Sequence, residues 1–597
     1  MLKKKAGVFF ILFITHSCVS FAQDSNALLD KIIVLKSKKA FEGYYTLGSD
    51  NLQSLPFDAP VEALSVTFLN LQSRSPNSSI QADFSLRGSN FQGVRVLLNG
   101  RRINDPQTGH HNADIPLTKE DLSSIDILSG VSPLGFGPDA IGGAVNFITK
   151  RPKEKKAVLE LSGGEFGSYG QLFSLSDKIR GLGLRFSVEN KESDGFSKDT
   201  DFKKFTANMA SSLDMPLGSF DLDFGYQEKE FGAYDFYTPG LGYPSKEWTK
   251  TYLLSSGFNL DKDGLIIKPS FIWRRHFDKF MLDKTQARSS FISHHRTDVY
   301  TPSIYLSRES QLIGRIGLGL EYSQESITST TLGRHNRAQR SVFIDNDYSF
   351  SDRLSLASIL RFEDYDGRDL SYTGSIRLSY EAVKDHLFHL GVSRAIRIPS
   401  FTELYYNDPT TVGASDLSCE KSLTYEAGHS YKHGKFSLVS VFFLRGEDNF
   451  IDWVKANPLQ SKWEARNIAS SQVIGIEESL QYTFNELVNL RLNYAYTSRS
   501  KDDKGYIYKY GENYARHLTS LISVFNLDFG VQEFGLTYKK PPSRSGWLLL
   551  HAKFNYNLNK NTKFFLSATN IFNVEYQEIA GIPSPGRWVE GGIRVEW

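Results

Sequence analysis

Apolar and polar residues alternate one by one along most of the chain from about residue 157 onward. In residues 220–227 every apolar side chain falls on one face and every polar or small side chain on the other, and residues 490–496 and 589–597 repeat the pattern. A period of two is the period of a β-strand whose two faces meet different surroundings. The pattern therefore predicts strand after strand, each with one apolar and one polar face.

Transmembrane β-barrels contain such strands, and so do soluble β-sandwiches and β-helices. The mean hydropathy is negative, and no apolar run after residue 22 reaches the roughly 20 residues that a spanning helix needs. An α-helical membrane protein is therefore excluded. At about 20 residues for each strand with its connection, residues 157–597 make about 22 antiparallel strands. The lumen of so large a barrel is too wide for wall side chains to fill, so it needs a plug.

Aromatic residues make up 13% of the chain and gather at predicted strand ends, as at 405–406, 508–510 and Trp588. Transmembrane barrels carry girdles of aromatic side chains where the wall meets the two membrane surfaces. We expect these residues on the outer face of the wall, and they favour the barrel over the soluble alternatives.

Residues 1–22 have the three parts of a secretory signal peptide: lysines at 3–5, an apolar run at 6–14 and small residues before Gln23. The alternative is an uncleaved anchor, for which the apolar run is short. Cleavage would leave Cys419 as the only cysteine, so no internal disulfide is expected. The formal net charge of +2 gives no indication of a nucleic-acid partner.

Residues 37–152 differ from the rest of the chain. The alternation there is short, and Gly and Asn interrupt it often. The apolar stretch 94–98 ends in the turn sequence Asn99-Gly100. We predict a compact α+β module in this region, which would be the plug.

Five blocks, in order along the chain, resemble motifs of the TonB-dependent outer-membrane receptors. In the module, residues 85–88 (SLRG), 94–100 and 137–149 (GPDAIGGAVNFIT) are similar to the family's I-R-G element, its V-L-x-D-G strand and turn, and its closing plug sequence. In the strand-rich part, 393–404 (SRAIRIPSFTEL) and 570–587 are similar to two barrel motifs. A single GG or NG pair would be weak, but the ordered set is specific.

The resemblance implies an all-β transmembrane barrel of about 22 antiparallel strands (153–597) with the N-terminal α+β plug domain (37–152) in its lumen. It implies a transporter rather than an enzyme, with no cofactor, which imports a scarce and bulky nutrient across the outer membrane. The plug sequence is most similar to cobalamin transporters, and ferric siderophore or haem receptors of the same family are the alternative. The implied partners are TonB with its ExbB/ExbD energy complex, outer-membrane lipid, the small-molecule cargo and a surface lipoprotein on a monomeric receptor.

Residues 23–36 form the expected periplasmic N-terminus and hold a candidate TonB box. An extended β-branched stretch can add as a strand to the sheet of a partner through its free backbone groups. The alternatives are a first plug strand or a linker. The box consists of Asp30, Lys31, Ile32, Ile33, Val34 and Leu35.

Three loops are predicted to contact the cargo. The histidines of the second could bind the cargo or hydrogen-bond within the plug, and adjacent histidines on a strand point to opposite faces, so we predict no metal site of the protein. The aromatic residues of the third loop could stack on a flat cargo or belong to the girdle. The residues are Arg74, Asn77 and Gln81 in the first loop, Asn104, Gln107, His110, His111 and Asn112 in the second, and Tyr234, Phe236 and Tyr237 in the third.

Two residues are predicted to attach the plug to the wall, namely Arg87 and Asp126. Where the family usually has Arg-Gly-Pro, this chain has Ser129 followed by Gly and Val, so we expect attachment to depend more on Arg87. No nucleophile–base motif or phosphate-binding loop is recognisable, since no Gly-Lys-Ser/Thr follows the glycines at 137–143. An outer-membrane adhesin or a barrel enzyme without TonB coupling are the alternatives from other classes.

Overall fold

The computed structural model describes residues 44–75, 80–130, 137–286, 292–366, 370–408, 410–501, 505–511 and 513–597. The predicted signal peptide, the candidate TonB box and Asn77 lie outside these residues. Of the helices in the described ranges, none has both the length and the apolar character needed to cross a membrane.

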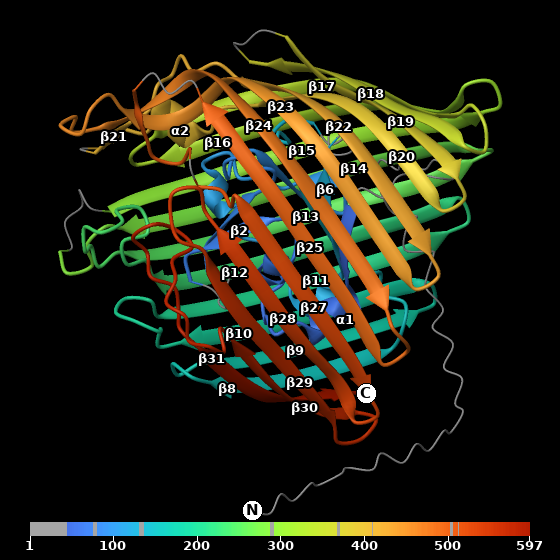
Figure 1. The fold of residues 1–597 in the computed structure, drawn as a ribbon, viewed down its shortest axis with the longest axis horizontal. Coiled ribbons are helices and arrows are strands. Elements are labelled where there is room, and N and C mark those ends of the chain that lie inside the picture. The colour runs from blue at the N-terminus through green and yellow to red at the C-terminus, as the bar shows by residue number, and fades with distance from the viewer. Residues whose placement is uncertain are drawn as a thin grey trace, which may run out of the picture.

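A closed antiparallel barrel forms the wall of the molecule (Figure 1). Within the described residues it contains 22 strands of 8 to 21 residues and two short segments, β21 (Thr411–Val412) and β26 (Ile507–Tyr508). This confirms the predicted fold class. The long strands are β8 (Lys156–Gly164), β9 (Tyr169–Ile179), β10 (Leu182–Ser193), β11 (Phe202–Met215), β12 (Gly218–Gly232), β13 (Lys246–Lys262), β14 (Leu265–Met281), β15 (Ile292–Ser310), β16 (Gly314–Ser329), β17 (Gly333–Ser349), β18 (Leu354–Tyr365), β19 (Ser371–Val383), β20 (His386–Arg397), β22 (Glu420–His433), β23 (Phe436–Lys455), β24 (Trp463–Thr483), β25 (Val488–Lys501), β27 (His517–Leu527), β28 (Gly530–Lys540), β29 (Trp547–Asn557), β30 (Thr562–Thr569) and β31 (Trp588–Glu596).

The barrel closes where β31 pairs with β8. The pairing runs from Glu590 opposite Gly164 to Glu596 opposite Val158, and the backbones of Trp597 and Ala157 exchange two further hydrogen bonds of 2.8 and 3.0 Å. Closure gives every strand two neighbours, so the backbone groups of the wall can be satisfied within it, as a lipid environment requires.

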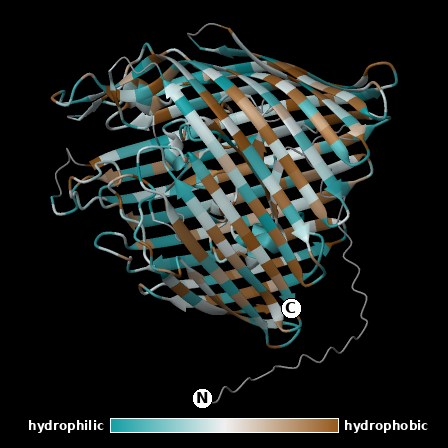
Figure 2. Ribbon diagram, in the orientation of Figure 1, coloured by the Kyte–Doolittle hydropathy of each residue, from teal (hydrophilic) through white to brown (hydrophobic). Residues whose placement is uncertain are grey.

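The period-two pattern sorts side chains between the outside and the lumen. In β19 Tyr372 and Ile376 are 50% and 58% exposed, whereas Thr373 and Arg377 are 0% and 4% exposed. Figure 2 shows the resulting alternation of hydrophobic and hydrophilic residues along the strands. The apolar face meets the surroundings of the barrel and the polar face meets the contents of its lumen, as the sequence predicts.

The plug fills the lumen, where it is drawn in blue in Figure 1. Its main sheet has the order β1-β6-β7-β4-β5, with β4 and β7 parallel, and β2 and β3 form a separate hairpin. The apolar core of this α+β module continues into the wall through Leu253, Ile272 and Ile522. The plug elements are β1 (Tyr44–Gly48), α1 (Ser49–Ser54), η2 (Glu62–Val66), β2 (Asn70–Ser73), β3 (Ala82–Ser85), β4 (Val94–Leu98), β5 (Arg101–Arg102), η3 (Gly109–His111), η4 (Lys119–Asp121), β6 (Leu122–Ser129) and β7 (Gly143–Thr149).

The girdle prediction is wrong for two of the aromatic residues on which it rested. Trp588 is only 3% exposed and packs edge-on against Phe166, with ring centroids 4.8 Å apart. Tyr510 points inward and meets the ring of the plug residue Phe91 edge-on at 5.1 Å. Their positions near strand ends did not distinguish the outer face of the wall from the mouth of the lumen.

Candidate functional site

The apex of the plug is the loop of residues 104–114, and a barrel segment holds its backbone. The helix α2 (Phe401–Tyr405) lies between β20 and β21, with Ser400 and Glu403 forming a capping box at its start. The backbone N–H groups of Phe401 and Thr402 donate to the carbonyl oxygens of Pro106 and Gln107, at 2.9 and 3.1 Å. These are free donors of the first helical turn, so the barrel motif identified in the sequence positions the apical loop.

The two histidines of the loop lie in η3 and face different groups. The Nδ1 of His110 lies 2.7 Å from Asp83, and its ring stacks on Phe91 with centroids 4.1 Å apart. His111 instead places Nε2 3.4 Å from a carboxylate oxygen of Asp278 in β14. The two histidines lie in a 3₁₀ turn rather than on a strand, and the turn directs their side chains to different partners.

The surroundings of the two imidazoles move their pKa values in opposite directions. Burial lowers the pKa of His110 to about 4, although Asp83 opposes the shift. Burial alone would also lower the pKa of His111, but the hydrogen bond and charge of Asp278 raise it to about 9. Near neutral pH His110 is therefore an uncharged ring, while His111 carries a proton in the metal-free protein.

The loop between β12 and β13 folds over the plug. The hydroxyl of Tyr237 accepts a hydrogen bond from the amide of Gln81 at 2.6 Å and donates to Glu247 at 3.1 Å. The guanidinium of Arg74 lies over the rings of Phe236 and Tyr237, 6.0 and 5.7 Å from their centroids. The first and third predicted loops thus meet over the second, and the inward packing of Phe236 does not fit the girdle alternative.

The remaining polar residues of the loop are engaged with the protein. Asn104 donates to the carbonyl of Val94 and accepts from the N–H of Val96, and Asn112 accepts from the N–H of Asp105. Gln107 donates to Asp278 at 3.0 Å. Of the predicted cargo residues that the structure describes, only Tyr234 and Tyr237 are partly exposed, and the others are buried. These two rings are therefore the accessible part of the predicted cargo set.

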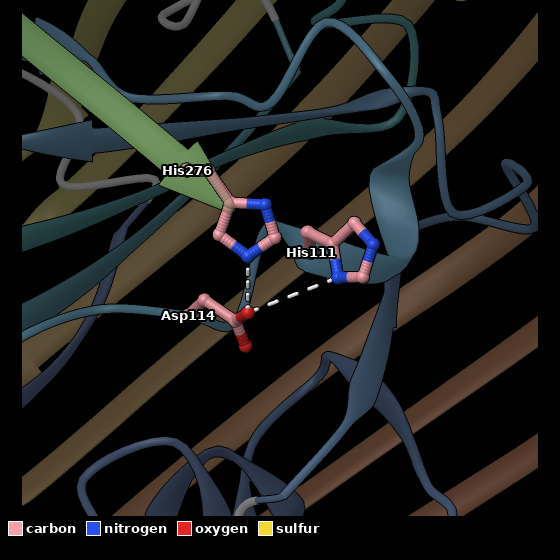
Figure 3. Close-up of side chains that lie close together, drawn as sticks. All are labelled: His111, Asp114 and His276. Atoms are coloured by element: carbon pink, nitrogen blue, oxygen red, sulfur yellow. Dashed lines mark hydrogen bonds and ion pairs between the residues drawn. The ribbon is translucent and has the colours of Figure 1, made fainter. Parts of the chain in front are cut away.

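A second cluster surrounds His111 (Figure 3). Nε2 of His276, on β14, lies 2.8 Å from Asp114, and Nδ1 of His111 lies 3.8 Å from the same carboxylate. The ammonium of Lys229 also contacts Asp114. The barrel members of this cluster were not predicted from the sequence. The alternation of β14, which turns residues 274, 276 and 278 toward the lumen, is the sequence signal that indicates them.

Arg87 of the plug forms ion pairs with two residues of the wall. Its guanidinium lies 2.7 Å from Glu426 in β22 and 2.7 Å from Glu477 in β24, and the side chain is 2% exposed. Ser129 joins this cluster, because its hydroxyl accepts from Arg87 and donates to Glu477. Asp126, the other predicted attachment residue, accepts a hydrogen bond from Thr46 across the β1–β6 pair of the plug sheet.

We expect Gly130→Ala to disturb this attachment. Gly130 has a φ of +72°, and an added Cβ would lie 2.0 Å from a carboxylate oxygen of Glu426. Because Arg87 and His389 already hold that carboxylate, the clash should destabilise the folded protein by about 1–3 kcal/mol. Thermal denaturation of the purified protein measures the effect. Gly446→Ala is the matched control, since its Cβ meets nothing within 4 Å, and equal loss in both variants would contradict the expectation.

Comparisons with known proteins match both parts of the chain. A family model described as "TonB dependent receptor-like, beta-barrel" matches residues 169–571, and one described as "TonB-dependent Receptor Plug Domain" matches residues 43–144. The vitamin B12 transporter BtuB of Photobacterium profundum is 23% identical over 517 residues, which cover 82% of each chain. The BtuB of Vibrio vulnificus is 21% identical over 66% of this chain and 65% of its own length.

Solved structures of siderophore receptors share the fold. The receptor PirA from Pseudomonas aeruginosa superposes with a TM-score of 0.73 at 16% identity, over 94% of this chain and all of its own. PirA from Acinetobacter baumannii gives 0.77 at 14% identity, over 93% and 98%. At these identities the likeness concerns the architecture of barrel and plug.

Proposed function

We propose that this chain, which belongs to the TonB-dependent receptor family, imports cobalamin or a related corrinoid across the outer membrane. The family consists of transporters and receptors rather than enzymes, and its members take up small-molecule cargo in dependence on TonB. The observation that carries the choice of cargo is the similarity to two vitamin B12 transporters, the first over 82% of both chains.

The aromatic side chains near the apical loop of the plug favour a flat and bulky cargo. Tyr234 and Tyr237 are the partly exposed members of the predicted cargo set, and the ring of Tyr237 adjoins that of His110, which in turn contacts Phe91 and Tyr510. Aromatic faces offer a large apolar contact area to a macrocycle at a small cost in conformational entropy. A cargo that displaces Tyr237 would also break its hydrogen bonds to Gln81 and Glu247, which link the plug to the wall.

A route past the plug would leave the lumen at the end opposite the apical loop. A cavity of about 390 Å³ lies between the plug and the wall there, next to residues 150–153, where the chain passes from plug to barrel. Its lining includes Asn99, Arg101, Asp221 and Asp223. These polar side chains, in a lining that also contains apolar ones such as Ile148 and Phe258, would offer hydrogen bonds to a cargo that crosses once the plug has rearranged.

Energy for uptake would enter through the N-terminus. In our proposal the signal peptide (1–22) is removed on export, and TonB, driven by ExbB/ExbD, pairs with residues 30–35 as an added strand. The apolar outer face of the wall would contact outer-membrane lipid. We further propose that the receptor is a monomer and that a surface lipoprotein covers its extracellular side.

Binding of candidate cargoes to the purified receptor tests the choice of cargo. We expect cyanocobalamin to bind, with ferric siderophores and haem at least tenfold weaker, and Tyr237→Ala to weaken cyanocobalamin binding by roughly tenfold. Isothermal titration calorimetry measures the dissociation constant of each cargo for the wild-type protein and of cyanocobalamin for the variant. Tyr372→Ala, on the outer face of β19, is the control that should bind normally. Tight binding of a siderophore or of haem, with none of cyanocobalamin, would overturn the corrinoid assignment.

A further inference from the structure

We propose that His111, Glu247 and Asp278 form a binding site for one divalent transition-metal ion that ties the apical loop of the plug to the barrel wall. The three residues come from η3, β13 and β14, and one ligand atom of each lies within 4.8 Å of the other two. The imidazole belongs to the plug and both carboxylates belong to the wall. An ion held by all three would therefore bridge the two parts of the molecule.

The two carboxylates of the cluster favour a divalent cation over the single proton that His111 carries in the metal-free protein. Glu247 is 0% exposed and Asp278 is 5% exposed, and a buried carboxylate is costly unless a positive charge compensates it. Among the described residues, no lysine or arginine forms an ion pair with either carboxylate, and the ion-pair partners of Asp278 are His111 and His295. A divalent ion would compensate both carboxylates at once.

Asp278 also has an unused ligand atom. One of its oxygens accepts a hydrogen bond from Gln107, whereas the other, Oδ1, is buried and accepts none from the described residues. Glu247 accepts hydrogen bonds from the single hydroxyl of Tyr237, at 3.1 and 3.3 Å. A buried oxygen without a donor is an unfavourable feature of a folded protein, and metal coordination removes it.

The neighbouring group of His111, Asp114 and His276 is a poorer metal site (Figure 3). The carboxylate of Asp114 is already paired with the ammonium of Lys229 and with Nε2 of His276. A metal ion there would face the charge of Lys229 and would have to replace the hydrogen bond between His276 and Asp114. We therefore assign the ion to the side of His111 that faces Asp278.

The donor set selects the kind of metal. Calcium and magnesium prefer oxygen ligands alone, whereas an imidazole with carboxylates suits zinc and other late first-row divalent ions. Catalytic zinc sites have three protein ligands and one open position, whereas structural zinc sites are closed by a fourth ligand. Nε2 of His295 lies 4.0 Å from Asp278, and a shift of this side chain toward the ion would supply a fourth ligand. Zinc is therefore the probe of choice.

Metal content of the purified full-length protein tests the proposal. The protein is first treated with a chelator, then given Zn²⁺ and passed through gel filtration to remove unbound metal. We expect one equivalent of zinc to remain bound, as measured by inductively coupled plasma mass spectrometry. His111→Ala and the pair Glu247→Gln with Asp278→Asn should each lose this equivalent. Zinc should also raise the melting temperature of the wild-type protein and leave that of both variants unchanged.

Two control variants make the test specific. His294→Ala removes an exposed histidine of β15, next to His295 and on the opposite face of the strand, and should keep the full equivalent. His276→Ala removes a member of the neighbouring group only and should also keep it. X-ray absorption at the zinc edge of the wild-type complex, which needs no variant to fold, should show nitrogen and oxygen ligands with imidazole scattering. No bound zinc in the wild type, or loss in His276→Ala with retention in the carboxylate pair, would overturn the proposal.

Discussion

Replacing Arg87 by alanine is expected to loosen the plug within the barrel. The guanidinium makes ion pairs of 2.7 Å with both Glu426 and Glu477, and all three side chains are at most 6% exposed. Removal of Arg87 leaves two buried carboxylates close together without their shared cation, which typically costs about 3–5 kcal/mol. The loss falls on the contact between plug and wall, because the arginine lies in the plug and both acids lie in the barrel.

Hydrogen exchange of the plug amides, measured by mass spectrometry, should therefore accelerate in Arg87→Ala, while exchange in the barrel strands stays slow. Cells that carry the variant should become more sensitive to large antibiotics that the outer membrane normally excludes. The triple variant Arg87→Ala, Glu426→Gln, Glu477→Gln is the matched control, since neutral amides no longer repel each other and part of the protection should return. Unchanged plug exchange in Arg87→Ala would show that other contacts hold the plug.

Deleting residues 30–36 is expected to abolish uptake and to leave cargo binding intact. The predicted cargo residues lie in the plug loops and the β12–β13 loop, whereas the deleted segment precedes the plug strand β1. Without a segment that can pair with TonB, the receptor has no connection to the energy of the inner membrane. Transport of the labelled cargo into cells should fall to the level of cells that lack the receptor, with an unchanged dissociation constant for the purified protein.

The matched control for the deletion replaces residues 30–36 by a flexible Gly-Ser segment of equal length. It should also fail to support uptake, because the missing element is a strand-forming sequence rather than a spacer. Expression and barrel folding of both variants are checked by their heat-dependent gel mobility. Continued uptake in either variant would contradict TonB coupling through residues 30–36 and would favour a passive route through the barrel.

The architecture could be predicted from the sequence because it depends on a local and repeated signal. A one-residue alternation, as in residues 220–227, reports directly which face of a strand meets lipid and which meets the lumen, and about 20 residues per strand gave the strand number. The attachment through Arg87 was predictable from the resemblance at residues 85–88. The role of Ser129 as a fourth member of that cluster followed only from the folded structure, since its partner Glu477 is 348 residues away.

The candidate site was harder to predict, because its members meet through tertiary contacts. His111 was identified, but Glu247, His276 and Asp278 belong to wall strands whose polar residues look alike along the whole barrel. Their proximity to the plug depends on the register of β13 and β14 and on the height of the apical loop, and neither is a local property of the sequence. The girdle prediction was wrong for Trp588 and Tyr510 for the same reason, since an aromatic ring at a strand end can turn toward the membrane or toward the lumen.

The pairing of β31 with β8 has a consequence for assembly. These two edge strands are separated by more than 400 residues in the chain. The barrel therefore cannot close until nearly the whole wall has been synthesised. Until then both edge strands expose unpaired amides and carbonyls, which readily capture strands of other chains. The nascent protein should therefore depend on periplasmic chaperones. A mutation that weakens the β31–β8 pairing should cause aggregation and degradation before any defect in uptake can be measured.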